Sequence, residues 1–237
     1  MPVWTSLAGS RFLPHELACA ESLVNPKRVV LALKIVLWVC ALSPGAYLLQ
    51  GFFAGSLGVN PVERLTLWTG MTALILLTAS LAITPVRRLS GWNPVIGLRR
   101  PLGLFAFFYA SIHFIVWFAF YNVLDFSYMW DDIVERRFIT AGMAALLVMA
   151  PLAATSTKGA IRRLKKRWRV LHRGAYLAAI LGVVHYFWLV KADARLPWVF
   201  AVILAALLAF RIPSFRTSGG GGRRKQGSEP EPTARPS

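Results

Sequence analysis

Two histidines, His113 and His185, lie deep inside long apolar segments and are the residues whose type and position point to chemistry. Ionisable side chains buried in such segments are costly and usually functional. At the helical rise, His113 lies about 16 Å and His185 about 21 Å from the basic end of its segment. Two neutral imidazoles at similar depth on helices of the same direction suit the axial positions of heme iron. The alternative is that each is a hydrogen-bonded packing residue.

Residues beside the two histidines would shape such a site. Small side chains could leave room for a porphyrin and aromatic ones could wall it. The small residues are Gly103, Ala106, Ala110, Ala178 and Gly182, and the aromatic residues are Phe107, Phe114, Tyr186 and Trp188.

A third histidine, His172, lies at the start of the segment that carries His185, 185 − 172 = 13 residues earlier. That separation is about 20 Å along a helix, which suits a second heme across a membrane. Residues so spaced are about 140° out of phase, so a shared face needs a bend, for example at Gly182, or hemes on different sides. From the residues alone, an interfacial histidine in a basic loop is the favoured interpretation.

At the level that corresponds to His172, the segment that carries His113 has two arginines, Arg99 and Arg100, and no histidine. Guanidinium groups bind carboxylates and phosphates bidentately. These arginines could therefore hold heme propionates or a flavin phosphate. Anchoring the chain at the membrane surface is an equally good explanation of the pair.

The elements that must position these residues are apolar helices in a bilayer. The chain is 56% hydrophobic and only 16% charged, against roughly 25% charged in soluble domains. Six apolar segments approach the roughly 20 residues that cross a bilayer, at 29–53, 65–84, 101–121, 138–155, 171–190 and 197–210. Prolines 85, 101 and 197 are expected to start or stop helices at segment edges. We therefore expect an all-α integral membrane protein, a heme-binding bundle of six transmembrane helices.

The charges predict the orientation of this bundle. The net charge is +17, but the basic clusters alternate with apolar segments, which argues against nucleic-acid binding. Every strongly basic loop falls on one side, so the positive-inside rule places both termini in the cytoplasm. We expect a cytoplasmic lead over 1–26, a membrane domain over 27–212 and a disordered cytoplasmic tail over 213–237.

Several classes of protein lack support in the sequence. Cys19 and Cys40 form no CxxC pair, and there is no CxxCH for covalent heme attachment. No P-loop, dinucleotide fingerprint or internal repeat is recognised. No Asp or Glu lies near the middle of an apolar segment, which counts against an ion-coupled transporter.

Six short strings carry a family resemblance. In order they are LGVNPVE at 57–63, TPVRR at 84–88, RRPLGL at 99–104, TSTK at 155–158, RWRVLHRGAY at 167–176 and HYFW at 185–188. Together they resemble the MsrQ (YedZ) family, the heme-binding membrane subunit of a bacterial periplasmic methionine sulfoxide reductase system, within the ferric-reductase-like transmembrane proteins. The resemblance covers about 31–211. One departure is that family members often have a histidine just before Thr69-Gly70, where this chain has Trp68.

The resemblance implies b-type heme held by His113, His172 and His185, and FMN. It makes His172 a ligand, and it matches Arg99 and Arg100 to a basic pair of the family. It implies a multi-pass protein of the bacterial inner membrane, with a periplasmic molybdopterin-containing methionine sulfoxide reductase as partner. Electrons would come from the quinone pool or a cytoplasmic flavin reductase and serve repair of oxidised envelope proteins.

Three functions are consistent with these observations. The leading one is an electron carrier, distinct from the catalytic subunit that it serves. The second is a stand-alone quinol-oxidising or ferric-reductase-like cytochrome b. The third is a membrane protein without redox function, in which the histidines only pack.

Overall fold

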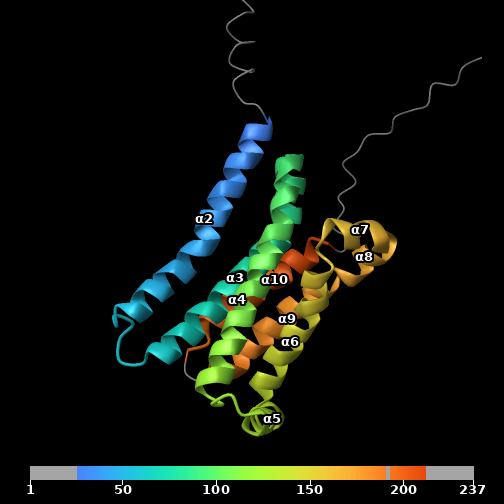
Figure 1. Cartoon of the computed structure of the whole chain (residues 1–237). Coiled ribbons are helices and arrows are strands. Elements are labelled where there is room, and N and C mark those ends of the chain that lie inside the picture. Colours follow the sequence, from blue (N-terminus) through green and yellow to red (C-terminus); the bar gives the residue numbers. More distant parts are fainter. Residues whose placement is uncertain (1–25, 191–192, 212–237) are drawn as a thin grey trace, which may run out of the picture.

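The computed structural model describes residues 26–190 and 193–211, and this part of the chain is helical and contains no strand (Figure 1). The elements are α2 (Pro26–Phe53), α3 (Pro61–Ser90), the 3-10 helix η1 (Asn93–Leu98), α4 (Arg99–Phe120), α5 (Phe126–Glu135), α6 (Arg137–Ala154), α7 (Lys158–Leu164), α8 (Lys166–Leu171), α9 (Gly174–Leu189) and α10 (Arg195–Ala209). The all-α expectation is confirmed. The expected lead, apart from Pro26, and the expected tail lie outside the described residues.

Five helical stretches are long and apolar enough to cross a membrane, at Arg28–Phe53, Pro61–Ser90, Asn93–Phe120, Arg137–Ala154 and Lys166–Leu189. The chain is thus a multi-pass membrane protein. The sixth predicted segment forms α10, which has only 15 residues. A helix of 15 residues is shorter than the roughly 17 to 25 residues that span a hydrocarbon core. Of the six expected spans, α10 is therefore the one whose length falls short.

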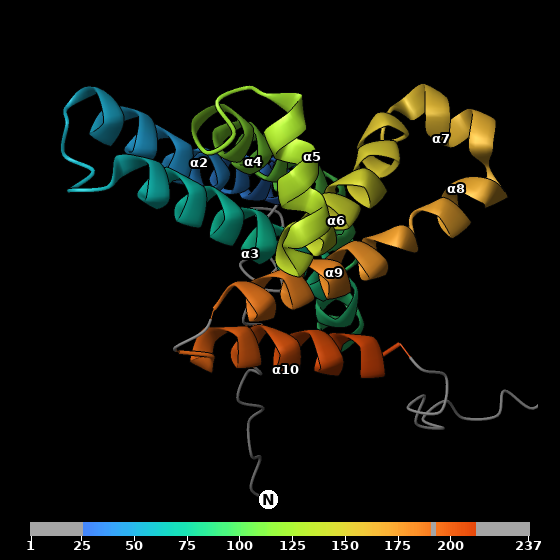
Figure 2. The same cartoon turned by 90° about the horizontal axis from the view of Figure 1, so that it is seen from below.

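Two antiparallel helix pairs make up the bundle, α3 with α4 and α6 with α9. Figure 2 shows α10 lying along α9 on the outside of these pairs. Ala106, Ala178 and Ala179 are completely buried in the shared core. Small residues at such positions let helix backbones approach closely, and close packing is the main source of stability between helices in lipid.

A tyrosine joins α2 to this core. Pro44 lies inside α2, and its ring nitrogen cannot donate to the carbonyl of Cys40, which accepts from Ser43 Oγ at 3.1 Å instead. One residue further on, Gly45 N donates to the Tyr109 hydroxyl at 3.0 Å, and that hydroxyl donates to Ala41 O at 2.7 Å. The phenol thus replaces a backbone hydrogen bond of α2, so every group stays satisfied in an apolar setting.

The second helix is longer than expected because α3 continues through Pro85 to Ser90. The prediction that Pro85 ends this helix is wrong. Proline removes the donor that would serve Leu81 O four residues earlier. In the folded chain Arg211 Nη2 donates to that carbonyl at 3.1 Å, so α3 proceeds without an unsatisfied buried group.

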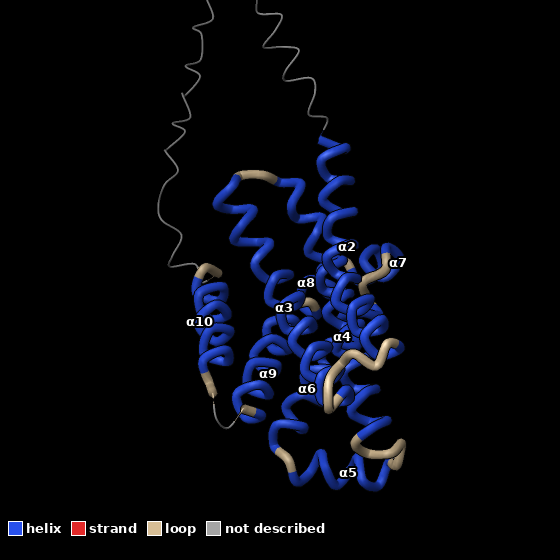
Figure 3. The backbone as a smooth tube through the Cα atoms, turned by 90° about the vertical axis from the view of Figure 1, so that its left-hand side faces the viewer, coloured by secondary structure: helices blue, strands red, loops and turns tan. Residues whose placement is uncertain are grey.

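The two ends of the bundle differ in charge, and α5 marks one of them (Figure 3). All acidic residues of the described part lie at this acidic end, namely Glu63, Asp125, Asp131, Asp132, Glu135 and Asp193. The opposite, basic end has Arg87, Arg88, Arg99, Arg100, Arg162, Arg163, Lys165, Lys166, Arg167, Arg169, Arg173 and Arg211.

Candidate functional site

A cavity of about 660 Å³ lies between α3, α4, α6 and α9, and both deep histidines line it. Its other lining residues are almost all apolar. Four of the residues expected beside the histidines line the cavity, namely Ala110, Phe114, Gly182 and Tyr186. Gly103, Ala106, Ala178, Phe107 and Trp188 do not; Ala106 and Ala178 are core residues and Trp188 is exposed.

The imidazoles of His113 and His185 face each other in this cavity. Their ring centroids are 6.1 Å apart and their planes are nearly perpendicular, at 88°. A bond between a metal ion and an imidazole nitrogen is about 2 Å long. Two imidazoles on opposite sides of one metal ion would therefore have centroids roughly 6 Å apart. The observed separation fits one iron atom between the two rings.

Each imidazole is held by a backbone carbonyl of the neighbouring helix. His113 Nδ1 is 2.8 Å from Thr66 O, and His185 Nδ1 is 2.6 Å from Phe138 O. A carbonyl can only accept, so each Nδ1 is the protonated donor and each Nε2 keeps a free lone pair. Metal-binding histidines are typically oriented in this way by a partner of the second nitrogen.

Glycines on α3 and α6 make room for the two rings. A Cβ on Gly70 would lie 2.9 Å from the ring of His113, and a Cβ on Gly142 would lie 2.7 Å from that of His185. Any larger residue would push the imidazole out of its position, because such contacts are too short for carbon. The two glycines therefore belong to the site, although the sequence analysis did not identify them.

A repeated spacing could have revealed these partners. In both helix pairs the histidine is 47 residues after the residue whose carbonyl holds it. Each glycine follows that carbonyl residue by four positions, which places it one helical turn further along the same face. The two halves of the site thus repeat one local arrangement.

The third histidine, His172, lies apart from this pair. It follows α8 at the basic end, and its ring stacks on Trp168 with centroids 3.9 Å apart. Its Nδ1 is 3.1 Å from Trp168 O and its Nε2 is 3.4 Å from Ser156 Oγ. The chain is irregular at His172 and Arg173, and α9 then runs unbroken through Gly182. The bend considered at Gly182 is therefore not found there. The chain instead makes a turn at His172 and Arg173, before α9 begins at Gly174.

The two candidate arginines differ in position. Arg99 begins α4 and is half-buried, whereas Arg100 is exposed. The positive charge of Arg99 acts on both His172 and Arg211, so Arg99 lies near each of them. Arg99 is thus the better placed of the two to meet a ligand near His172.

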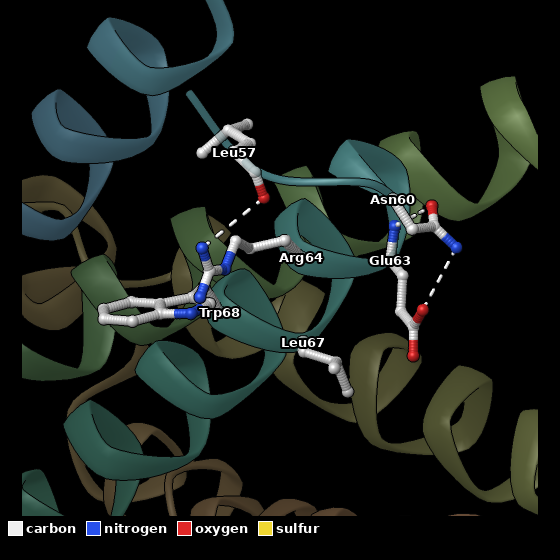
Figure 4. Close-up of a pocket in the computed structure, with 6 residues that line it drawn as sticks. All are labelled: Leu57, Asn60, Glu63, Arg64, Leu67 and Trp68. Carbon is white, nitrogen blue, oxygen red and sulfur yellow. Dashed lines mark hydrogen bonds between the residues drawn. The ribbon is translucent and has the colours of Figure 1, made fainter. Parts of the chain in front are cut away.

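A smaller pocket of about 360 Å³ lies at the acidic end (Figure 4). The side chain of Asn60 caps α3, because it accepts from Glu63 N at 3.2 Å and donates to the Glu63 carboxylate at 3.0 Å. Arg64 Nη1 is 3.4 Å from Leu57 O. The LGVNPVE string at 57–63 therefore fixes the start of α3. Its last residue, Glu63, is about one turn before Thr66, whose carbonyl holds His113. Leu67 and Trp68 line both this pocket and the large cavity.

Comparison with known proteins places this geometry in context. The family model described as "Ferric reductase like transmembrane component" matches residues 69–183, which include His113 and His172. Similar proteins carry the description "Protein-methionine-sulfoxide reductase heme-binding subunit MsrQ". The protein from Rhodospirillum rubrum is 47% identical over 83% of this chain and 93% of its own length. That from Deinococcus radiodurans is 48% identical over 70% of this chain and 82% of its own. No solved structure matches this chain.

Proposed function

The chain belongs to the MsrQ family of heme-binding subunits of protein-methionine-sulfoxide reductases, and from this premise we propose that it is a membrane cytochrome b that passes electrons to a methionine sulfoxide reductase. The facing pair of His113 and His185 carries the proposal. With a centroid separation of 6.1 Å and free Nε2 atoms, these two residues would hold one heme iron between them. Heme bound there supplies reversible one-electron transfer.

The chain's own residues would position the cofactor. The carbonyls of Thr66 and Phe138 fix the tautomer and direction of both imidazoles. Gly70 and Gly142 let the rings lie against α3 and α6. The apolar lining excludes water, which lowers the local dielectric and thereby tunes the reduction potential. The protein is thus an electron carrier, and catalysis on the sulfoxide belongs to its partner.

The position of the pair supports a periplasmic acceptor. His113 is seven residues from the end of α4 at the acidic side, and His185 is four from the end of α9. These distances are about 10 Å and 6 Å along the helices. The basic end faces the cytoplasm under the positive-inside rule, which places both termini there and the protein in the bacterial inner membrane. The acceptor is then a periplasmic molybdopterin-containing reductase that repairs oxidised envelope proteins.

A second cofactor position near the basic end completes the proposed path. His172 is a further heme ligand in this proposal, and Arg99 or Arg100 holds a heme propionate or the phosphate of FMN. Electrons enter from the quinone pool or from a cytoplasmic flavin reductase. The basic segment 162–173 is exposed at this end and suits the docking of an acidic donor.

An optical difference spectrum, dithionite-reduced minus air-oxidised, tests the proposal on detergent-purified protein. We expect the b-type bands of the heme between these two histidines to disappear in His113→Ala and in His185→Ala. Ile115→Ala is the matched control, since Ile115 is on the same helix as His113 and is 58% exposed. Full heme content in either histidine variant, measured as pyridine hemochrome per chain, would refute the ligand assignment.

The match to a ferric-reductase-like component supports a second candidate, a stand-alone quinol-oxidising or metal-reducing cytochrome. It differs from the first in needing no reductase partner. Rapid ferric iron reduction by the purified chain with a quinol as donor would favour it. Heme reoxidation only upon addition of the periplasmic reductase with methionine sulfoxide would favour the leading proposal.

A further inference from the structure

Three arginines converge at the basic end, from elements far apart in the sequence. Arg88 is near the end of α3, Arg99 begins α4, and Arg211 follows α10. Arg88 Nη1 donates to Phe210 O at 3.2 Å, which ties the end of α3 to the residue before Arg211. The Arg211 guanidinium also lies over the ring of Tyr176, 4.6 Å from its centroid. We refer to Arg88, Arg99 and Arg211 as the arginine cluster.

This convergence is electrostatically unfavourable in the absence of an anion. Burial, with added repulsion from Arg99 and Arg88, lowers the pKa of Arg211 to about 10. No carboxylate within residues 26–190 and 193–211 offsets these charges, since the acidic residues there all lie at the other end. Like charges held close together outside bulk water repel strongly, so an anion among them would stabilise the arrangement.

Two buried polar atoms in the same region have no hydrogen-bond partner within the described chain, namely Arg211 Nε and Thr84 Oγ1. Thr84 shares one face of α3 with Arg88 and with Leu81, whose carbonyl is bound by Arg211. Buried polar groups are almost always satisfied in native proteins. An unsatisfied guanidinium nitrogen and a hydroxyl on adjoining surfaces are the donors that an oxyanion requires.

We propose that the arginine cluster, together with Thr84, binds the phosphoryl group of a membrane phospholipid or of a mononucleotide. Guanidinium groups match phosphoryl oxygens in a bidentate geometry, and the start of α4 adds the positive end of a helix dipole. The proposal rests on and deepens the role given above to Arg99, and it takes Arg88 and Arg211 in place of Arg100. The phosphoryl site lies at the opposite end of the bundle from the pair formed by His113 and His185.

Ligand binding by the full chain in detergent tests this site, with phosphatidylglycerol and FMN as separate probes. Native mass spectrometry measures the retained lipid, and equilibrium dialysis measures FMN. We expect one ligand per chain, with affinity reduced roughly tenfold in Arg88→Gln, Arg99→Gln and Arg211→Gln, because each loses a charged hydrogen bond. Arg163→Gln is the control, since Arg163 is exposed at the same end. Retention of phosphatidylglycerol alone identifies a lipid site, and retention of FMN alone identifies a mononucleotide site.

The b-type spectrum of each variant separates this proposal from the proposed function. Intact His113–His185 bands with loss of phosphoryl binding support the site. Equal binding by the wild type and all three cluster variants overturns it. Loss of heme from the cluster variants with unchanged phosphoryl binding also overturns it and assigns the arginines to a heme carboxylate. If Arg211→Gln misfolds, Arg88→Gln still tests the site. Arg88 is exposed, so its replacement should leave the fold intact.

Discussion

Gly142 of α6 lies against the imidazole of His185 so closely that a Cβ would be 2.7 Å from Nδ1. The same Nδ1 is 2.6 Å from Phe138 O, one turn earlier on that helix. The imidazole therefore packs against the backbone of α6. This helix sets both the distance of the ring from its backbone and the direction in which Nδ1 points. On α3, Gly70 leaves room for the imidazole of His113 in the same way, and the carbonyl of Thr66 accepts from its Nδ1.

Gly142→Ala should weaken heme binding without unfolding the bundle. The added methyl group pushes the imidazole of His185 away from α6, and such overpacking typically costs about 1–3 kcal/mol. We expect heme affinity to fall by roughly 10- to 100-fold, measured by heme titration of the apoprotein. Gly159→Ala is the control, because a Cβ on Gly159 meets no atom within 4 Å. Equal heme affinity in the two variants would contradict the packing argument.

The crossed imidazole planes predict a distinctive electron paramagnetic resonance spectrum. His113 and His185 have an interplanar angle of 88°. Two imidazoles that held one heme iron at this angle would leave two of its dπ orbitals nearly equal in energy, and the ferric low-spin signal would then be highly anisotropic. We expect this signal in the oxidised protein and its absence in His185→Ala. An ordinary rhombic low-spin spectrum would show that the planes are nearly parallel when iron is bound.

Removing the hydroxyl of Tyr109 should loosen α2 without affecting heme. Tyr109→Phe loses the bonds to Gly45 N and Ala41 O, and a hydrogen bond between membrane helices contributes about 0.6–2 kcal/mol. We expect the free energy of unfolding to fall by about 1 kcal/mol, measured by titration with a denaturing detergent. Heme content should stay unchanged, since Tyr109 does not line the cavity.

A matched variant, Tyr128→Phe, provides the control for this measurement, because Tyr128 is 65% exposed on α5. Similar stability of Tyr109→Phe and Tyr128→Phe would mean that Gly45 and Ala41 restore their own backbone bond at no cost.

His172→Ala should remove the second heme proposed near the basic end and so lower the heme content by one per chain. The remaining heme would keep the bands of the His113–His185 site, because His172 lies at the other end of the bundle. Pyridine hemochrome quantification per chain measures the change. Arg173→Ala is the neighbouring control, since Arg173 is exposed. An unchanged ratio in His172→Ala would leave His172 with only its local contacts to Trp168 and Ser156.

The sequence by itself determined the membrane class, the two deep histidines and the separation of charge between the two ends. These properties depend on hydropathy and on position along a helix, which can be read residue by residue. It also predicted that His113 and His185 lie at similar depth, because both helices run in the same direction. The predictions of His113, His172 and His185 as heme ligands, and of Arg99 and Arg100 as cofactor contacts, still await experiment.

Only the tertiary structure decided how the helices meet. It brought Thr66 and Phe138 to the two histidines across a separation of 47 residues. It also carried α3 through Pro85, because Arg211 supplies the donor that proline removes. None of these three contacts could be predicted from local pattern, since each joins elements whose facing sides depend on the packing of the whole bundle. The same is true of the arginine cluster, whose members become neighbours only when the end of α3, the start of α4 and the end of α10 come together.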